Sequence, residues 1–122
     1  MMKVKEKVFF NRHGKAVLRL RGAVFYDFMG KPRGFLIGKT VYGNDGQHRG
    51  FLVRNVLWDR KGRIVGFMFG AKVPEVKFPL VQFPPVPYKD QPEPDPPPNI
   101  VDLECPTLIP KWSIMPLENF LV

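Results

Sequence analysis

A step of 16 residues recurs four times without insertion between residues 10 and 73, and this repeat limits the fold more than any other feature of the chain. One column of the aligned units is aromatic: Phe10, Tyr26, Tyr42 and Trp58. Four positions later every unit has glycine: Gly14, Gly30, Gly46 and Gly62. A repeat this regular indicates a small structural unit that buries its apolar face against its neighbours.

Each unit has the pattern of a β-hairpin. The residue three positions before the repeated glycine is Asn or Asp in three units (Asn11, Asp27 and Asp59), and the third unit has Gly43-Asn44-Asp45-Gly46. Asn or Asp at the first position of a turn with glycine at the fourth is typical of a type I turn with a G1 bulge. Between units the chain reverses at Gly22, Gly38, Arg54-Asn55 and Gly70. We therefore predict an all-β fold of four tandem 16-residue hairpins.

One strand column differs between the units. It holds Leu18 in the first unit and glycine in the others, at Gly34, Gly50 and Gly66. A glycine inside a strand marks a bulge or the close approach of another group, so the first unit should differ slightly. The residues that follow, such as Phe35, Leu36 and Ile37, are apolar in succession, which indicates that both faces of the strand are covered. We expect a partner subunit or the C-terminal tail to cover the second face.

Composition and charge both change near Val73. Of the 14 prolines, 13 follow this residue. The chain up to Val73 contains 16 Lys and Arg against 4 Asp and Glu, whereas the remainder contains 3 against 7. We predict a lead-in over residues 1–9, a four-repeat hairpin domain over 10–73, and a proline-rich acidic tail with an apolar C-terminal segment over 74–122.

The tail has two interpretations. Residues 82–98 are rich in proline and lack a helical or strand period, so they should be extended polyproline II. The interpretation that we favour is a spacer that crosses the domain surface and docks the apolar C-terminal segment, in which a short helical turn follows Pro116. The alternative is a ligand for an aromatic groove on a partner, because Pro84-Pro85-Val86-Pro87 fits a PxxP motif.

The four aromatic-x-x-x-Gly hairpins of residues 10–73 resemble the 4-fold beta flower domain, a hairpin-repeat domain of bacterial proteins. The resemblance implies a pseudo-fourfold arrangement of the hairpins around an axis. It implies no activity, because the family has no assigned function. The proline-rich tail is not part of the pattern that carries the resemblance.

Few residues suggest chemistry. His13 and His48 occupy different phases of the repeat near the hairpin turns, and Ser113 is the only serine. The single cysteine, Cys105, excludes an intrachain disulfide and a cysteine-based zinc site. No Ser, Cys or His arrangement has the spacing of a known catalytic motif. We therefore expect no enzymatic activity, no cofactor and no metal site.

Basic residues form the one suggestive set. They lie in or just after the hairpin turns: Arg12, Lys15, Lys31, Arg33, Arg49, Arg60, Lys61 and Arg63. Arranged around an axis, these cations would attract a polyanion, with salt-dependent binding to nucleic acid. Interleaved aromatic side chains could then stack on bases. The alternative interpretation is that basic turns keep a β protein with exposed strand edges soluble, and an acidic protein or a glycan is a further partner class.

These observations lead to three functional hypotheses. The first is a non-enzymatic binding or structural module, whose partner is an unknown protein or a second copy of the chain in an oligomer. The second is a nucleic-acid-binding protein that uses the basic turns. The third is an enzyme whose site is assembled between subunits. We see no signal peptide and no apolar run long enough to cross a membrane, so we expect a cytoplasmic protein without membrane contact.

Overall fold

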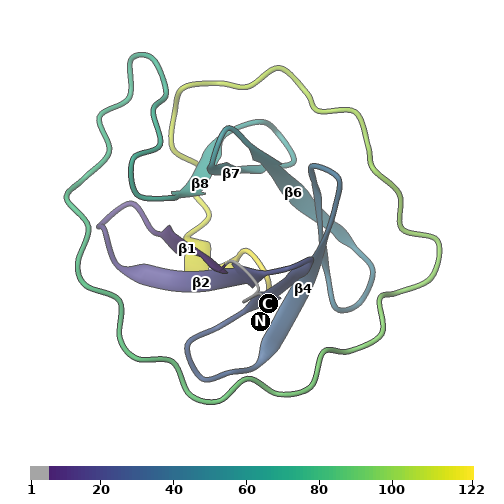
Figure 1. The fold of residues 1–122 in the computed structure, drawn as a ribbon. Helices are drawn as coiled ribbons and strands as arrows, with labels where there is room; N and C mark the ends of the chain where they lie inside the picture. The colour runs from purple at the N-terminus through teal and green to yellow at the C-terminus, as the bar shows by residue number, and fades with distance from the viewer. Residues whose placement is uncertain (1–5) are drawn as a thin grey trace.

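The computed structural model describes residues 6–122 and shows a closed barrel of eight antiparallel strands with the rest of the chain wound around it (Figure 1). Most of the predicted lead-in, residues 1–5, lies outside the described residues. The strands form four hairpins in chain order: β1 (Glu6–Phe10) with β2 (Ala16–Arg21), β3 (Val24–Tyr26) with β4 (Pro32–Ile37), β5 (Thr40–Gly43) with β6 (His48–Val53), and β7 (Val56–Asp59) with β8 (Ile64–Phe67).

Strands that are consecutive in the chain are also neighbours in the barrel. The pairing of Phe10 in β1 with Phe67 in β8 closes the ring. The barrel thus has two ends: the four hairpin turns lie at one, and the links between hairpins lie at the other. The predicted all-β fold, with four tandem hairpins in a pseudo-fourfold arrangement, is confirmed.

The hairpin turns have the predicted chemistry. In the first, the Gly14 amide donates to the Asn11 carbonyl at 2.9 Å, and the Asn11 Oδ1 accepts from the amides of His13 and Lys15 at 2.9 and 3.0 Å. The register of the two strands shifts beside the turn, as a G1 bulge requires. Gly14 has φ of +79°, and glycine adopts this conformation without a Cβ clash.

The interior of the barrel repeats with the sequence. One side chain from the first strand of each hairpin points inward, and these four side chains are fully buried: Phe9, Phe25, Val41 and Leu57. Their chain neighbours Phe10, Tyr26, Tyr42 and Trp58 lie on the outer face, because successive side chains of a strand point to opposite faces. The aromatic column of the repeat therefore faces outward, away from the barrel interior.

The C-terminal residues close the turn end of the barrel. We call residues 112–122 the plug; they include a short 3-10 helix, η1 (Leu117–Asn119), directly after Pro116. Leu117, Phe120 and Leu121 are at most 4% exposed and belong to the same core cluster as the inward-facing strand residues. The plug therefore supplies part of the barrel core.

The strand glycines make room for the neighbouring strand and for the plug. A Cβ at Gly66 would lie 2.7 Å from Leu117 Cδ2. At Gly50 and Gly34 an added Cβ would first meet the backbone carbonyl oxygens of Trp58 and Tyr42 on the next strand, and then the Phe120 ring at 2.9 Å and Leu121 Cδ2 at 3.1 Å. In the first hairpin, Leu18 occupies the corresponding position and is itself a core residue, as the predicted difference of this unit requires.

The proline-rich segment encircles the barrel. We call residues 74–111 the belt; Figure 1 shows it passing around all four hairpins. It contacts the turn glycines in chain order: Leu80 at Gly14, Lys89 at Gly30, Pro97 at Gly46 and Thr107 at Gly62. The belt covers the outer aromatic column as well; for example, the Tyr42 hydroxyl donates to the Val101 carbonyl at 2.6 Å. The chain's own tail thus covers the second face of the strands.

Candidate functional site

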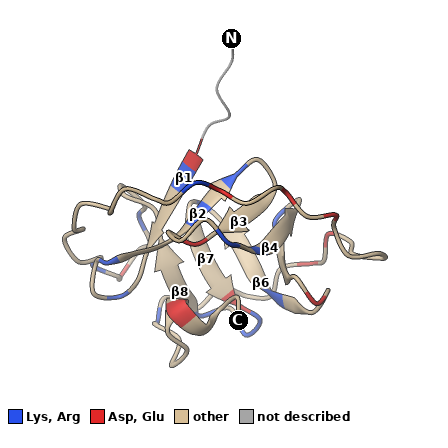
Figure 2. Ribbon diagram, turned by 90° about the horizontal axis from the view of Figure 1, so that it is seen from below, with Lys and Arg blue, Asp and Glu red and all other residues tan. Residues whose placement is uncertain are grey.

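The eight basic residues lie in or just after the hairpin turns, at the end of the barrel that the plug closes. Asn11 Nδ2 in the first turn donates to Glu118 of η1 at 2.9 Å, and Arg49 donates to the Val122 carbonyl at 3.3 Å. Figure 2 views the barrel from the side and shows Lys and Arg segments near the C-terminus. The hairpin geometry therefore brings the predicted cations to one rim.

Three of these eight cations are held by neighbouring groups. Arg33 pairs with Asp27 of its own hairpin at 3.0 Å, and Arg49 pairs with Asp45 at 3.0 Å. The Arg12 guanidinium lies 5.8 Å from the centre of the Trp112 ring, in the range of a cation–π contact. These three residues stabilise the turns and the plug, so they are poor candidates for contacts to a ligand.

The other five basic residues are exposed: Lys15, Lys31, Arg60, Lys61 and Arg63. Across residues 6–122, none of the five forms an ion pair. We call this set the basic rim. Five of the eight residues predicted to bind a polyanion are therefore exposed and unpaired within residues 6–122.

The outer aromatic column does not support base stacking. Phe10, Tyr26, Tyr42 and Trp58 are between 3% and 5% exposed, because the belt lies over them. A base could not reach these rings without displacing the belt. The structure therefore supports a role in packing for the aromatic column, and it leaves charge as the only feature of the basic rim that favours nucleic acid.

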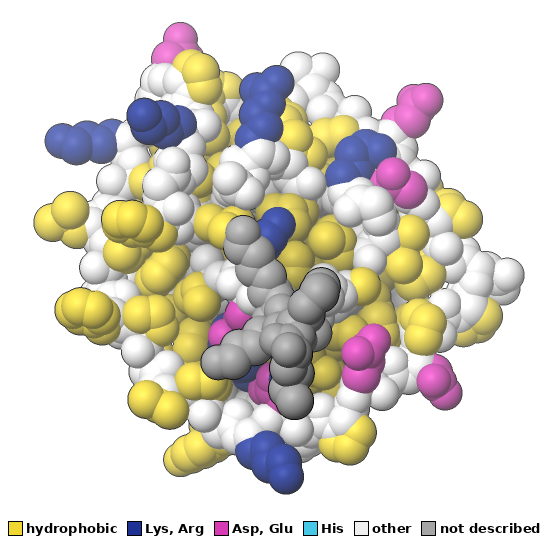
Figure 3. Space-filling model, in the orientation of Figure 1, with side chains coloured by type: hydrophobic (Ala, Val, Ile, Leu, Met, Phe, Trp, Pro, Cys, Tyr) yellow, Lys and Arg dark blue, Asp and Glu magenta, His cyan; other side chains and the backbone are white. Residues whose placement is uncertain are grey.

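A second surface includes the segment that the sequence offered as an alternative partner ligand, Pro84-Pro85-Val86-Pro87. Four belt side chains point into solvent, with exposed fractions of 95% for Leu80, 100% for Phe83, 91% for Val86 and 63% for Tyr88. We call these four residues the apolar ridge. Hydrophobic side chains project from the left edge of the molecule in Figure 3, where Figure 1 places the first part of the belt. Exposed apolar clusters of this kind mark interaction sites.

The apolar ridge is fixed at both sides. The Gln82 amide donates to the Gly14 carbonyl at 2.8 Å, and the Tyr88 amide donates to the Phe28 carbonyl at 3.0 Å. Between them, proline fixes the backbone and holds each preceding residue in an extended conformation, which applies to Phe83 and Val86. The ridge therefore presents its side chains on a segment that is already ordered.

A buried arginine ties the belt to the barrel. Arg19 occupies the column in which the other units have Phe35, Phe51 and Phe67, and only 3% of its side chain is exposed. Its guanidinium contacts Glu6 of β1 at 2.8 Å, Asp90 of the belt at 2.5 Å, and the Asp27 carbonyl at 2.6 Å. We call Arg19, Glu6 and Asp90 the clasp. The hydrogen bond from Arg19 is the main cause that lowers the pKa of the Asp90 carboxyl below its ordinary value.

Burial changes the pKa values of two further reactive side chains, Cys105 and His48. Burial raises the pKa of the Cys105 thiol, which keeps the weakly nucleophilic protonated form. Burial also lowers the pKa of His48, whose ring packs edge-on against Phe51 at 4.8 Å between centroids. In the described part of the chain, no three His, Cys, Asp or Glu side chains are grouped as metal ligands would be. Over the same residues, no helix has the length and apolarity needed to traverse a bilayer.

Fold and contacts together define a class: a closed barrel of four hairpin repeats, encircled by an ordered belt and closed by a plug from the same chain. The model of one family, described as the 4-fold beta flower protein, matches residues 7–121, and the chain belongs to this family. The match runs through the belt and the plug. The family pattern therefore includes the tail, whereas the resemblance seen in the sequence was limited to the hairpins of residues 10–73. No curated protein and no solved structure gave a match.

Proposed function

We propose that this protein is a non-enzymatic binding module that presents the apolar ridge to a protein partner. The observation that carries the proposal is the complete exposure of Phe83 on a belt segment whose neighbours are hydrogen-bonded to the barrel. An isolated proline-rich peptide loses conformational freedom when it binds. A segment that is already held extended loses less, and this favours its recognition.

The chemistry of the ridge indicates the class of partner. Extended proline-rich segments are recognised by shallow grooves lined with aromatic side chains, in which alternating prolines and apolar residues fill the pockets. The sequence Phe83-Pro84-Pro85-Val86-Pro87 offers both, and only Pro87 of the five is partly covered by the barrel. The sequence offered two alternatives for the tail, a spacer across the domain surface and a ligand for a partner. Under this proposal one segment serves both functions.

We expect a double substitution, Phe83→Ser with Val86→Ser, to abolish binding of the partner without loss of stability. Both side chains are almost fully exposed, and such changes usually alter the free energy of unfolding by less than about 0.5 kcal/mol. Quantitative affinity capture would compare three immobilised proteins: the wild type, the double variant and Phe69→Ser. The captured partner would then be purified and titrated against each of the three. Phe69 is 78% exposed but lies outside the ridge, so it is the matched control.

The proposal requires a protein that binds the wild type and Phe69→Ser but binds the double variant at least about tenfold more weakly. Equal recovery on all three baits would contradict it. If the captured protein is a second copy of the chain, sedimentation should show a self-association that the double variant loses, and the ridge would then be an oligomer interface.

Nucleic acid binding is the second candidate, and the five free cations of the basic rim favour it. Fluorescence anisotropy with labelled single- and double-stranded DNA should then show an affinity that falls steeply between low and physiological salt. Changing Lys31, Lys61 and Arg63 to Ala should weaken binding and reduce the salt dependence. Changing Arg33 and Arg49, whose charges are already paired, should matter less. Absence of binding at low salt would eliminate this candidate.

A further inference from the structure

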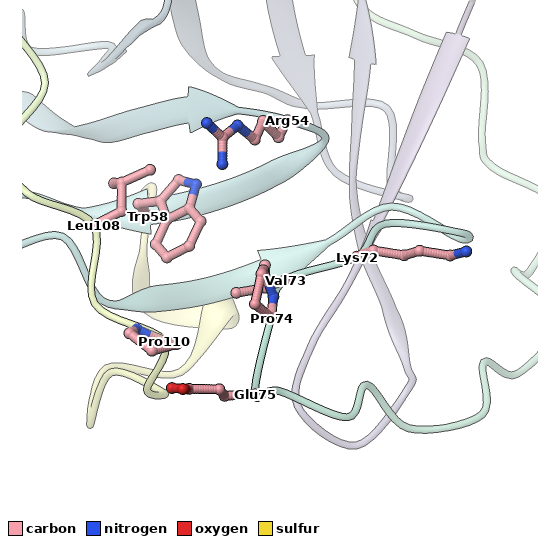
Figure 4. Close-up of a pocket in the computed structure, with 8 residues that line it drawn as sticks. All are labelled: Arg54, Trp58, Lys72, Val73, Pro74, Glu75, Leu108 and Pro110. Atoms are coloured by element: carbon pink, nitrogen blue, oxygen red, sulfur yellow. The ribbon is translucent and has the colours of Figure 1, made fainter.

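A cavity of about 300 Å³ lies where the two ends of the belt meet, beside the outer face of β7 (Figure 4). Trp58 of β7, which is 3% exposed, lies at its base, and Arg54 from the link between β6 and β7 lines it as well. The start of the belt contributes Pro74 and Glu75, and its end contributes Leu108 and Pro110. We call this the seam cavity. Its volume is at the lower limit of small-molecule sites in proteins.

The walls of the seam cavity favour a flat apolar molecule. Pro74, Leu108 and Pro110 present rings and methyl groups. The indole N–H of the buried Trp58 is already satisfied by the Val53 carbonyl at 3.1 Å, so the base of the cavity offers no free donor from this residue. Sites of this type bind an apolar body and fix its orientation through a few polar groups at the edge.

The backbone is strained at the two charged residues beside these walls. Arg54 has φ of +55° and occupies the column in which the other links have Gly22, Gly38 and Gly70; Glu75 has φ of +70°. Only Asn55 and Asn99 share this conformation among the non-glycine residues of the described chain, and asparagine tolerates it. Arginine and glutamate adopt it at an energetic cost. At Arg54 the two-residue link between β6 and β7 requires a positive φ, so what distinguishes this link is its charged side chain.

The two charged side chains at the seam cavity, Arg54 and Glu75, are not engaged in ion pairs with described residues. Figure 4 shows Arg54 and Glu75 on different sides of the cavity, and the Lys72 side chain extends away from the other labelled residues. An exposed guanidinium is a planar donor that matches a carboxylate, and a glutamate accepts from a hydroxyl or amide.

We propose that the seam cavity binds a small aromatic carboxylate, with the carboxylate at Arg54, the ring against Pro74, Leu108 and Pro110 beside the buried Trp58, and a hydrogen-bond donor at Glu75. The site would be independent of the apolar ridge and of the basic rim. It uses two positions at which the sequence has a charged residue where the backbone favours glycine. Arg54→Gly and Glu75→Gly therefore remove the polar contacts and relieve strain together.

The test is a titration with 4-hydroxyphenylacetate, in which NMR monitors the indole N–H signals of the two tryptophans, Trp58 and Trp112. We expect the chemical shift of the Trp58 signal to change with a Kd of about 1 mM or tighter, an affinity in the range open to a probe of this size. The chemical shift of the Trp112 signal should not change. Assignment uses Trp112→Phe. The amine analogue 4-hydroxyphenethylamine, which places a cation at Arg54, should bind about tenfold to a hundredfold more weakly.

The glycine variants keep the proposal falsifiable. Arg54→Gly should melt at the same temperature as the wild type or above it, and should lose the preference for the carboxylate over the amine. Glu75→Gly should lose the preference for 4-hydroxyphenylacetate over phenylacetate. Lys61→Ala, on the basic rim, should change neither preference. An unmoved Trp58 signal at saturating probe, or unchanged preferences in folded Arg54→Gly and Glu75→Gly, would overturn the proposal.

Discussion

Leu117→Ala should lower the free energy of unfolding by about 2–5 kcal/mol, although Leu117 lies far from every strand in the sequence. The residue is 1% exposed and fills the space beside Gly66 in the barrel core. Gly66→Ala should be destabilising by about 1–3 kcal/mol, because the added methyl group would lie 2.7 Å from Leu117 Cδ2. Urea unfolding, followed by tryptophan fluorescence, measures both effects.

The informative variant is the double substitution. Removing the Leu117 side chain relieves its contact with the methyl group at position 66 and leaves only the Phe10 carbonyl oxygen at 3.0 Å, so the combined loss should be smaller than the sum by about 0.5–3 kcal/mol. The control is Leu117→Ala combined with Gly22→Ala. Gly22 has no neighbouring atom within 4 Å of an added Cβ, so these two losses should be additive. Additive losses for the pair at positions 66 and 117 would show that the strand glycine does not serve the plug.

Arg19→Ala should lower the free energy of unfolding by about 3–5 kcal/mol, the loss typical of a buried ion pair from which one partner is removed. Asp90 would keep a carboxylate that is only 13% exposed and has lost its main hydrogen-bond donor. Arg21 also contacts Asp90, at 3.4 Å, but its side chain is 51% exposed. Arg21→Ala should therefore change the free energy of unfolding by less than about 1 kcal/mol.

The clasp also predicts the sign of an acid effect. The folded pKa of Asp90 lies below its value in the unfolded chain, so its stabilising contribution is complete above the unfolded value and is lost as the pH falls through the folded value. The wild type should therefore lose stability more steeply below about pH 4 than Arg19→Ala does. Parallel losses in the two proteins, measured by urea unfolding at several pH values, would contradict the assignment of the clasp.

The fold could be predicted from the sequence where the determinants are local. The turns are closed by the side chains of Asn11, Asp27 and Asp59, and the repeated glycine follows each of them three residues later. These local patterns are sufficient to predict the hairpins. The two-sided burial of the strands was also visible in runs such as Phe35-Leu36. Four similar units with short links then leave few arrangements other than a ring.

The path of the tail depends on contacts that leave no recognisable pattern of residue types in the sequence. The belt docks through backbone groups, such as the Gln82 amide on the Gly14 carbonyl, and any residue except proline supplies such a donor. A signal for the plug did exist. Three strand positions lack a side chain, at Gly34, Gly50 and Gly66, and apolar residues lie near the C-terminus. Some of these C-terminal residues, such as Ile114, are exposed, so the sequence indicates that a segment is available without identifying the residues that enter the core.

The candidate sites were less accessible than the fold. The basic rim was predicted because its members recur with the repeat, but the pairs made by Arg33 and Arg49 were not. Exposure of Phe83 could not be predicted, since an aromatic residue before prolines fits a docked segment equally well. The seam cavity combines residues from one link and from both ends of the belt, which only the closed path of the chain brings together.

The position of the plug also sets the order in which the protein can be completed during synthesis. All eight strands leave the ribosome before Leu117, Phe120 and Leu121 are made, and domains generally begin to fold from the N-terminal side. Until then, three of the four hairpins enclose an unfilled interior beside their glycines. A nascent or truncated chain that lacks these residues therefore exposes apolar surface to chaperones and proteases. The core can be complete only after translation has passed residue 121.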